Sequence, residues 1–167
     1  TFTNTSNLQG KLKEVTQMGA ELINDTSVEA DAEMISLVIE ALQNAGLTRF
    51  QVSIGEVEYF KGLCEEAGLD EETELQLRTC ISGKNYFAAQ ELLSERNVAE
   101  PYYSIFLKVA DMFSNMESLS DAKAMVHNSR SLAAIERLEK LYEVLKLYHV
   151  EEYVSFDLGM LSKYNYY

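Results

Sequence analysis

The chain has 167 residues, of which 47% are hydrophobic and 25% charged, a composition typical of a folded globular protein. Its 14 basic and 27 acidic residues give a net charge of −13, and its arginines are scattered along the sequence. Because an acidic surface without a basic stripe repels phosphates, this segment is not expected to bind nucleic acid.

The first 55 residues predict a strand, a helix and a second strand. Apolar and polar residues alternate imperfectly through 12–23, which indicates a strand. Thr26 and Glu29 form a capping box at the start of a helix that is expected to end at Gly46. Alternating apolar residues at 50–54 then predict the second strand.

The next part of the chain predicts a series of short helices. They are expected at 56–67, 70–82, 85–95, 102–114, 119–127 and 131–147. Gly68 and Gly83 are expected to close the first two, and Pro101 to begin the fourth, where its missing N–H is tolerated. A third strand is predicted at 153–158 and the beginning of a fourth at 163–167.

The predicted strand at 12–23 carries the most informative polar face. Gln17, Gly19 and Glu21 share this face, since alternate side chains of a strand point the same way. Glu21 can hold an ammonium group, Gln17, about 13 Å away, can orient it, and the glycine leaves room between them. The same alternation is also typical of a solvent-facing strand with a glycine bulge, so both interpretations stay open.

Other polar residues predict no metal, cofactor or catalytic site. His127 and His149 lack partners at ligand spacing, and Asp157 is interpreted as paired or exposed rather than catalytic. The acidic run at 65–74 lacks the calcium-loop pattern and is most simply a solvated helix junction. The sequence contains no phosphate-binding glycine loop, nucleophile elbow or zinc-protease motif.

The compartment follows from the cysteines and the apolar runs. Cys64 and Cys80 have no CxxC spacing, which favours free thiols in a reducing compartment over a single disulfide. No apolar run approaches the roughly 18 residues of a membrane span, and the first residues do not form a signal peptide. We therefore expect a cytoplasmic protein without membrane contact, and both ends of the sequence suggest a part of a longer protein.

Two stretches of the sequence carry a family resemblance. Residues 10–23, with 28–33 after them, resemble the end of motif 2 and the following helix of histidyl-tRNA synthetases. They resemble still more the synthetase-like regulatory subunits of short-form ATP phosphoribosyltransferase. Residues 156–167 resemble the second histidine-signature strand of that family, and Val52 to Glu56 also fits its layout. The similarity spans nearly the whole chain, although its helical middle is less specific than the two end motifs.

The resemblance implies an α+β fold, a partial class II aminoacyl-tRNA synthetase-like antiparallel sheet with a mostly helical insertion. In this layout residues 1–55 are part of the core sheet with one helix, 56–150 are the helical insertion, and 151–167 return to the core. It also implies a histidine-binding site at Gln17, Glu21 and Tyr167.

Two departures from the family motifs bear on catalysis. Thr3 and Ser162 stand where the resemblance places the arginines that stabilise the phosphate during amino-acid activation. Neutral hydroxyl groups cannot supply that positive charge. The expectation is a non-catalytic regulatory subunit that assembles with the catalytic phosphoribosyltransferase chain, forms a homodimer, and has histidine as its effector. A divergent histidyl-tRNA synthetase fragment and a scaffold with a vestigial pocket are the alternatives.

Overall fold

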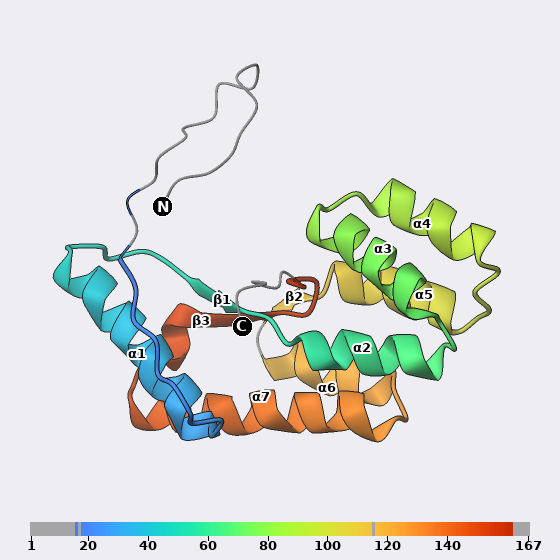
Figure 1. Cartoon of the computed structure of the whole chain (residues 1–167). Coiled ribbons are helices and arrows are strands. Elements are labelled where there is room, and N and C mark those ends of the chain that lie inside the picture. The colour runs from blue at the N-terminus through green and yellow to red at the C-terminus, as the bar shows by residue number, and fades with distance from the viewer. Residues whose placement is uncertain (1–15, 17, 115, 162–167) are drawn as a thin grey trace, which may run out of the picture.

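The structure is a computed structural model that describes residues 16, 18–114 and 116–161. The described elements follow one another along the chain as shown in Figure 1. They are α1 (Val28–Asn44), β1 (Val52–Ile54), α2 (Val57–Glu66), α3 (Glu71–Ser82), α4 (Tyr86–Glu95), α5 (Tyr102–Ala110), β2 (Phe113–Ser114), α6 (Met116–Ala124), α7 (Ser129–Leu147), η1 (Glu151–Tyr153) and β3 (Val154–Asp157). No helix in the described part of the chain is both long and apolar enough to cross a membrane.

The predicted helices are confirmed, and side-chain caps explain where most of them begin. Asp70, Asn85 and Asn128 accept hydrogen bonds from the first turns of α3, α4 and α7, where free backbone N–H groups need acceptors. At α1 the cap is Ser27, which accepts from Ala30 N–H at 3.1 Å, and not the predicted Thr26. Each start is thus fixed by a short polar side chain next to the helix it caps.

Three of the predicted helices need corrected boundaries. The fourth helix of the insertion, expected to run to residue 114, ends at Ala110, because Phe113–Ser114 pair with β3 instead. The fifth, expected at 119–127, is α6 and spans Met116–Ala124, and the sixth, α7, begins at Ser129 rather than at 131. The two cysteines are free thiols, as predicted; Cys64 is buried and Cys80 half-buried.

The three strands form a mixed sheet in the order β1-β3-β2. β1 pairs with β3 in parallel, with Ser53 opposite Ser155, and β2 pairs with β3 antiparallel. The purely antiparallel sheet expected from the sequence is therefore wrong, because the described sheet is mixed and β1 and β3 are parallel. Parallel neighbours need a long crossover connection, and the helices between β1 and β3 supply it.

The strand predicted at 12–23 is wrong for residues 18–23, which are irregular. They have no sheet partner among the described residues, and Met18 and Ile23 are 93% and 77% exposed. A strand is stabilised by its neighbours, so alternation of side chains alone does not produce one. The strand predicted at 163–167 lies outside the described residues.

The hydrophobic core lies between the helices and one face of the sheet. α2 and α7 lie side by side, α1 packs on α7, and α3, α4 and α5 gather at the other end (Figure 1). The Phe60 ring packs edge-on against Phe106, and Phe156 of β3 packs against Tyr142 of α7. Because alternate strand residues face opposite ways, burial of Phe156 turns Ser155 and Asp157 toward the other side of the sheet.

Candidate functional site

The predicted histidine-binding residues fall mostly outside the described part of the chain. Gln17, Tyr167, Thr3 and Ser162 all lie there. Glu21 is described, and its side chain is exposed in the irregular segment before α1. At Gly19, no atom of the described residues lies within 4 Å of where a Cβ would be. The three predicted residues are not seen together, and the histidine site stays a prediction.

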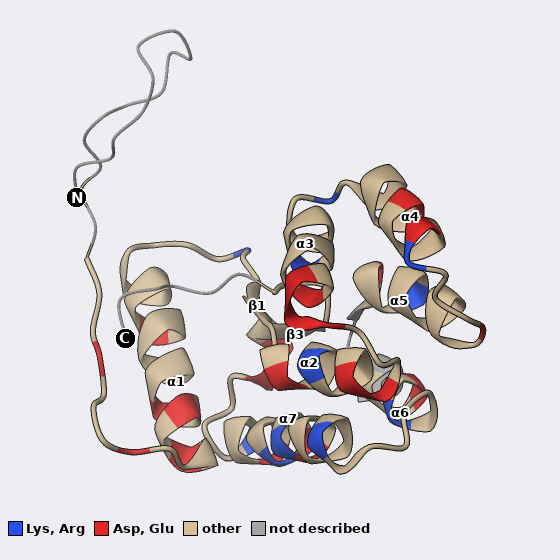
Figure 2. Ribbon diagram, turned by 45° about the vertical axis from the view of Figure 1, so that its right-hand side comes forward, with Lys and Arg blue, Asp and Glu red and all other residues tan. Residues whose placement is uncertain are grey.

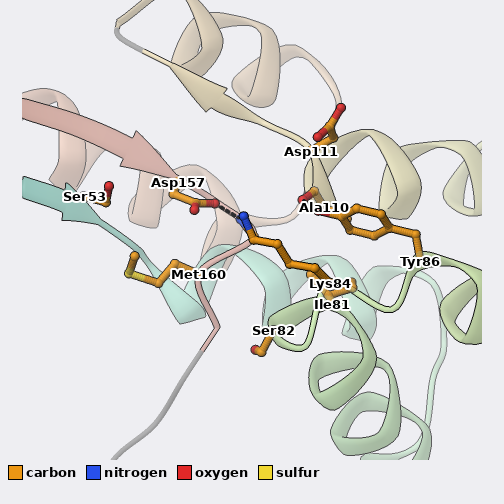
Figure 3. A pocket seen from close by; sticks show the side chains of 10 residues that line it. Ser53, Ile81, Ser82, Lys84, Tyr86, Ala110, Asp111, Asp157 and Met160 are labelled. Carbon is orange, nitrogen blue, oxygen red and sulfur yellow. Dashed lines mark hydrogen bonds between the residues drawn. The ribbon is translucent and has the colours of Figure 1, made fainter. Parts of the chain in front are cut away.

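A different site is formed at the carboxyl ends of β1 and β3. A cavity of about 500 Å³ opens there between the sheet and the loop that joins α3 to α4 (Figure 3). It is lined by Ser53, Ile81, Ser82, Lys84, Tyr86, Ala110, Asp111, Asp157, Gly159 and Met160. Cavities of this size commonly hold small molecules, and the carboxyl ends of parallel strands are a frequent place for them.

The polar face of the sheet forms one wall of this cavity. Ser53 lines it, and its Oγ shares a hydrogen bond of 3.3 Å across the parallel pair with Oγ of Ser155, a buried residue that does not line the cavity. Two residues further along β3, Asp157 accepts a hydrogen bond on Oδ1 from the Gly159 N–H at 2.9 Å. This turn fixes the Asp157 carboxylate and leaves its second oxygen, Oδ2, without a hydrogen bond from the described residues.

Two glycines allow the chain after β3 to come close to its neighbours. A Cβ on Gly159 would lie 2.7 Å from the Ala110 carbonyl oxygen, and one on Gly55 would overlap the backbone of Met160. Tyr86, at the start of α4, donates its hydroxyl to the same Ala110 carbonyl at 3.2 Å. These contacts join the end of α5, the start of α4 and the turn after β3 around one cavity.

Lys84 enters the cavity from a strained backbone position. Its φ of 53° is left-handed, and its N–H donates to the Ile81 carbonyl while Asn85 N–H donates to that of Cys80. This pair of hydrogen bonds is the Schellman motif that ends many helices, and its left-handed residue is usually glycine. The predicted closing residue, Gly83, is instead right-handed and one position too early, so a lysine occupies the left-handed position.

The same motif ends four other helices, so Lys84 can be compared with the residues that occupy the left-handed position there. Gly46 and Gly68 occupy the left-handed position after α1 and α2, as the sequence predicted, with φ of 89° and 71°. Asn97 and His149 occupy it after α4 and α7. Of the five residues, Lys84 is the one that lines the cavity described above.

The charged groups that line the cavity do not form ion pairs with one another. Lys84, Asp111 and Asp157 all line it, yet within the described ranges none of them belongs to an ion pair. Asp157 is half-buried, while Lys84 and Asp111 are exposed at the rim. The cavity is thus lined by two carboxylates and one ammonium group, together with the hydroxyls of Tyr86, Ser53 and Ser82.

Sequence reasoning missed this cavity because its residues come from four separate segments. The sequence pattern indicates only a paired or exposed Asp157 and no role for Lys84, Tyr86 or Asp111. The single local signal was the Gly83-Lys84-Asn85 order, which places glycine beside the left-handed position rather than in it. Through the part of the chain that is described, no three His, Cys, Asp or Glu residues could hold a metal ion.

The acidic run at 65–74 lies at the junction of α2 and α3 and is largely exposed, as expected, and several of its residues also have structural roles. Asp70 caps α3 through Thr73 N–H at 2.7 Å, Glu65 pairs with Arg130, and Glu74 pairs with Arg78. Glu66 accepts hydrogen bonds from the start of α7. Figure 2 shows this acidic colouring on α2 and α3 and basic positions on α7.

Comparisons of the sequence with known proteins identify the family of this chain. The histidyl-tRNA synthetase family model matches residues 1–167. The ATP phosphoribosyltransferase regulatory subunit of Syntrophotalea carbinolica is 40% identical over 162 residues, 97% of this chain. That of Acetivibrio thermocellus is 39% identical over 158 residues, 95% of this chain. In each case the chain spans 38% of the relative's own length.

A solved structure agrees with the sequence matches. The crystal structure of an ATP phosphoribosyltransferase regulatory subunit/histidyl-tRNA synthetase from Bacillus halodurans C has a TM-score of 0.79 and 31% sequence identity with this chain. The match covers 86% of this chain and 38% of that one. The resemblance seen in the sequence is confirmed, together with a class II synthetase-like fold. The chain belongs to the histidyl-tRNA synthetase family.

Proposed function

We propose that the chain is part of a non-catalytic regulatory subunit of short-form ATP phosphoribosyltransferase. In this role it is needed, in the cytoplasm, for the first step of histidine biosynthesis and for feedback regulation of that step by histidine. The observation that carries the proposal is that relatives 39–40% identical over 95–97% of this chain are ATP phosphoribosyltransferase regulatory subunits.

The proposal includes partners and an effector. The regulatory chain forms a homodimer and assembles with the catalytic phosphoribosyltransferase subunit in a hetero-oligomer. Histidine binds at Gln17, Glu21 and Tyr167, an assignment supported by the resemblance of residues 10–23 and 156–167 to the motifs of the family. For histidine to regulate the assembly it has to bind two assembly states with different affinity.

The absence of catalysis is proposed from Thr3 and Ser162. These residues stand where the family resemblance expects arginines, and they cannot stabilise charge developing on a phosphate. The alternative is a divergent histidyl-tRNA synthetase, since the matching family model carries that description. Histidine-dependent pyrophosphate exchange by the full-length protein separates the two, because only a synthetase forms the adenylate. Measurable exchange contradicts the regulatory proposal.

Association with the catalytic subunit tests the proposal directly. The full-length protein and the short catalytic chain from the same organism are mixed at micromolar concentration and separated by size-exclusion chromatography with light scattering. The proposal predicts co-elution as a defined hetero-oligomer. Separate elution of the two chains at this concentration contradicts it.

A further inference from the structure

The cavity at the carboxyl ends of β1 and β3 has a charge pattern that specifies a class of ligand. It presents one ammonium group, on Lys84, and two carboxylates, on Asp111 and Asp157, none of them in an ion pair with a described residue. A complementary ligand carries one carboxylate and two cationic nitrogens. Among small metabolites, these are the charges of a free basic amino acid, which fits a cavity of about 500 Å³.

The backbone of Lys84 is a second, independent observation. A side chain in the left-handed conformation is disfavoured relative to glycine. In the same motif α1 and α2 end with glycine, while α4 and α7 end with Asn97 and His149, two residue types that adopt this conformation more often than lysine does. After α3, Gly83 lies one residue too early and Lys84 takes the strained position, from which it lines the cavity. Strained residues of this kind are concentrated at ligand-binding positions.

Hydrogen bonds within the cavity wall orient the groups that would accept from the cationic nitrogens of the ligand. Gly159 N–H occupies Oδ1 of Asp157 and fixes the carboxylate, so that Oδ2 can accept from a ligand ammonium. Tyr86 donates its hydroxyl hydrogen to the Ala110 carbonyl, so that its oxygen can accept a second hydrogen bond from a cationic group. The acceptors are thus already oriented, while Lys84 supplies the cationic donor.

We propose that this cavity binds a free basic amino acid, with the ligand carboxylate on Lys84 and its cationic nitrogens on Asp157 and Asp111. The site is separate from the proposed histidine-binding residues at 17, 21 and 167, and it does not depend on the proposed role in the phosphoribosyltransferase. Binding at this site is measured on the full-length protein alone, so its outcome is distinguishable from a failure to associate with the catalytic subunit.

The test is calorimetric titration of the full-length protein with L-lysine, and with two analogues that each lack one group. Cadaverine lacks the carboxylate and 6-aminohexanoate lacks the α-amino group. The proposal predicts that wild type binds L-lysine more tightly than either analogue. Because each analogue lacks one charge-assisted hydrogen bond, its affinity is expected to be about tenfold or more lower than that of L-lysine. No binding of L-lysine by wild type at millimolar concentration overturns the proposal.

Lys84→Gly removes the proposed carboxylate ligand without straining the backbone. It is expected to weaken L-lysine binding about tenfold or more, to leave cadaverine binding unchanged, and to leave the melting temperature unchanged or higher. His149→Gly is the matched control, because His149 occupies the same motif position after α7 and does not line the cavity. Equal L-lysine binding by wild type and Lys84→Gly, or an equal loss in His149→Gly, contradicts the assignment.

Asp157→Asn tests the cationic end of the ligand. Asparagine keeps an oxygen that can accept from Gly159 N–H, so the turn after β3 is retained while the negative charge is lost. The proposal predicts that L-lysine and cadaverine both bind about tenfold more weakly, since both present cationic nitrogens. Unchanged affinity for both ligands contradicts the placement of an ammonium group at Asp157.

Discussion

Glu66, in the last turn of α2, accepts two hydrogen bonds from Asn128, the residue that caps α7. The Glu66 Oε2 atom lies 3.1 Å from Asn128 N and 2.6 Å from Asn128 Nδ2, and it also accepts from His127 N at 3.2 Å. Asn128 Oδ1 in turn accepts from Ser131 N–H at 2.7 Å. One carboxylate therefore holds in place the residue that begins the longest helix of the described chain.

Glu66→Ala is predicted to destabilise the protein. The substitution leaves the partly buried donors of Asn128 without their acceptor, which lowers the free energy of unfolding by about 1–3 kcal/mol. The measurement is urea denaturation followed by circular dichroism. Glu72→Ala is the control from the same acidic run, because Glu72 is exposed and, within the described chain, its side chain hydrogen-bonds only with Gln76 on its own helix. An equal effect of the two substitutions contradicts this role for Glu66.

The hydrogen bonds to Glu66 also predict a dependence of stability on pH. Burial acts to raise the pKa of this carboxyl, but the hydrogen bonds from Asn128 and the His127 N–H outweigh it and lower the pKa below 4.5. A lowered pKa in the folded state gives stability that is present above the unfolded pKa and is lost as pH falls through the folded pKa. Wild type should therefore lose its stability advantage over Glu66→Gln on acidification below about pH 4.5. A difference in unfolding free energy that stays constant from pH 7 to pH 3 contradicts the prediction.

Gly62 is predicted to be required for the contact between α2 and α7. A Cβ at this position would overlap Ser131 Oγ and Asn128 Oδ1 and would lie 2.8 Å from Ser131 N. Alanine favours a helix over glycine by roughly 1 kcal/mol, but the overlap with the cap of α7 is expected to cost more, for a net loss of about 2 kcal/mol. Thermal denaturation of Gly62→Ala measures it.

Gly19→Ala is the matched control for that substitution. Among the described residues, no atom lies within 4 Å of a Cβ placed on Gly19, so its replacement should change the unfolding free energy by less than about 0.5 kcal/mol. If Gly62→Ala is as stable as wild type, α2 and α7 can separate without loss, and the proposed importance of their contact is wrong.

Glu21→Ala is predicted to weaken histidine binding by the full-length protein. The proposed role of Glu21 is to hold the histidine ammonium group, and the loss of one charge-assisted hydrogen bond weakens binding about tenfold or more. Calorimetric titration with histidine measures this, with Glu33→Ala, an exposed carboxylate on α1, as the control. Binding of histidine that is the same in wild type and Glu21→Ala contradicts the assignment, and no binding by either favours a vestigial pocket.

The elements that could be predicted from the sequence are those with local signals. Helix starts follow from Asp70, Asn85 and Asn128, because a cap lies within three residues of the N–H group that it satisfies. Alternation of side chains could not decide whether residues 12–23 form a strand, since strands depend on partners that are distant in sequence. The parallel pairing of β1 with β3 was missed for the same reason.

The candidate cavity could not be predicted from the sequence for a related reason. Its charges lie at residues 84, 111 and 157, and their proximity depends on how the helical segment returns the chain to the sheet. The left-handed φ of Lys84 depends on one residue of register between Gly83 and the end of α3. Spacing along the sequence contains neither piece of information.

Activation of the catalytic subunit tests the central claim most directly. The short catalytic phosphoribosyltransferase chain is assayed for ATP phosphoribosylation alone, with the full-length protein, and with both the full-length protein and histidine. The regulatory role predicts low activity for the catalytic chain alone, a rise on addition of the full-length protein, and a fall when histidine is added. Activity of the catalytic chain that is the same with and without the full-length protein contradicts the claim.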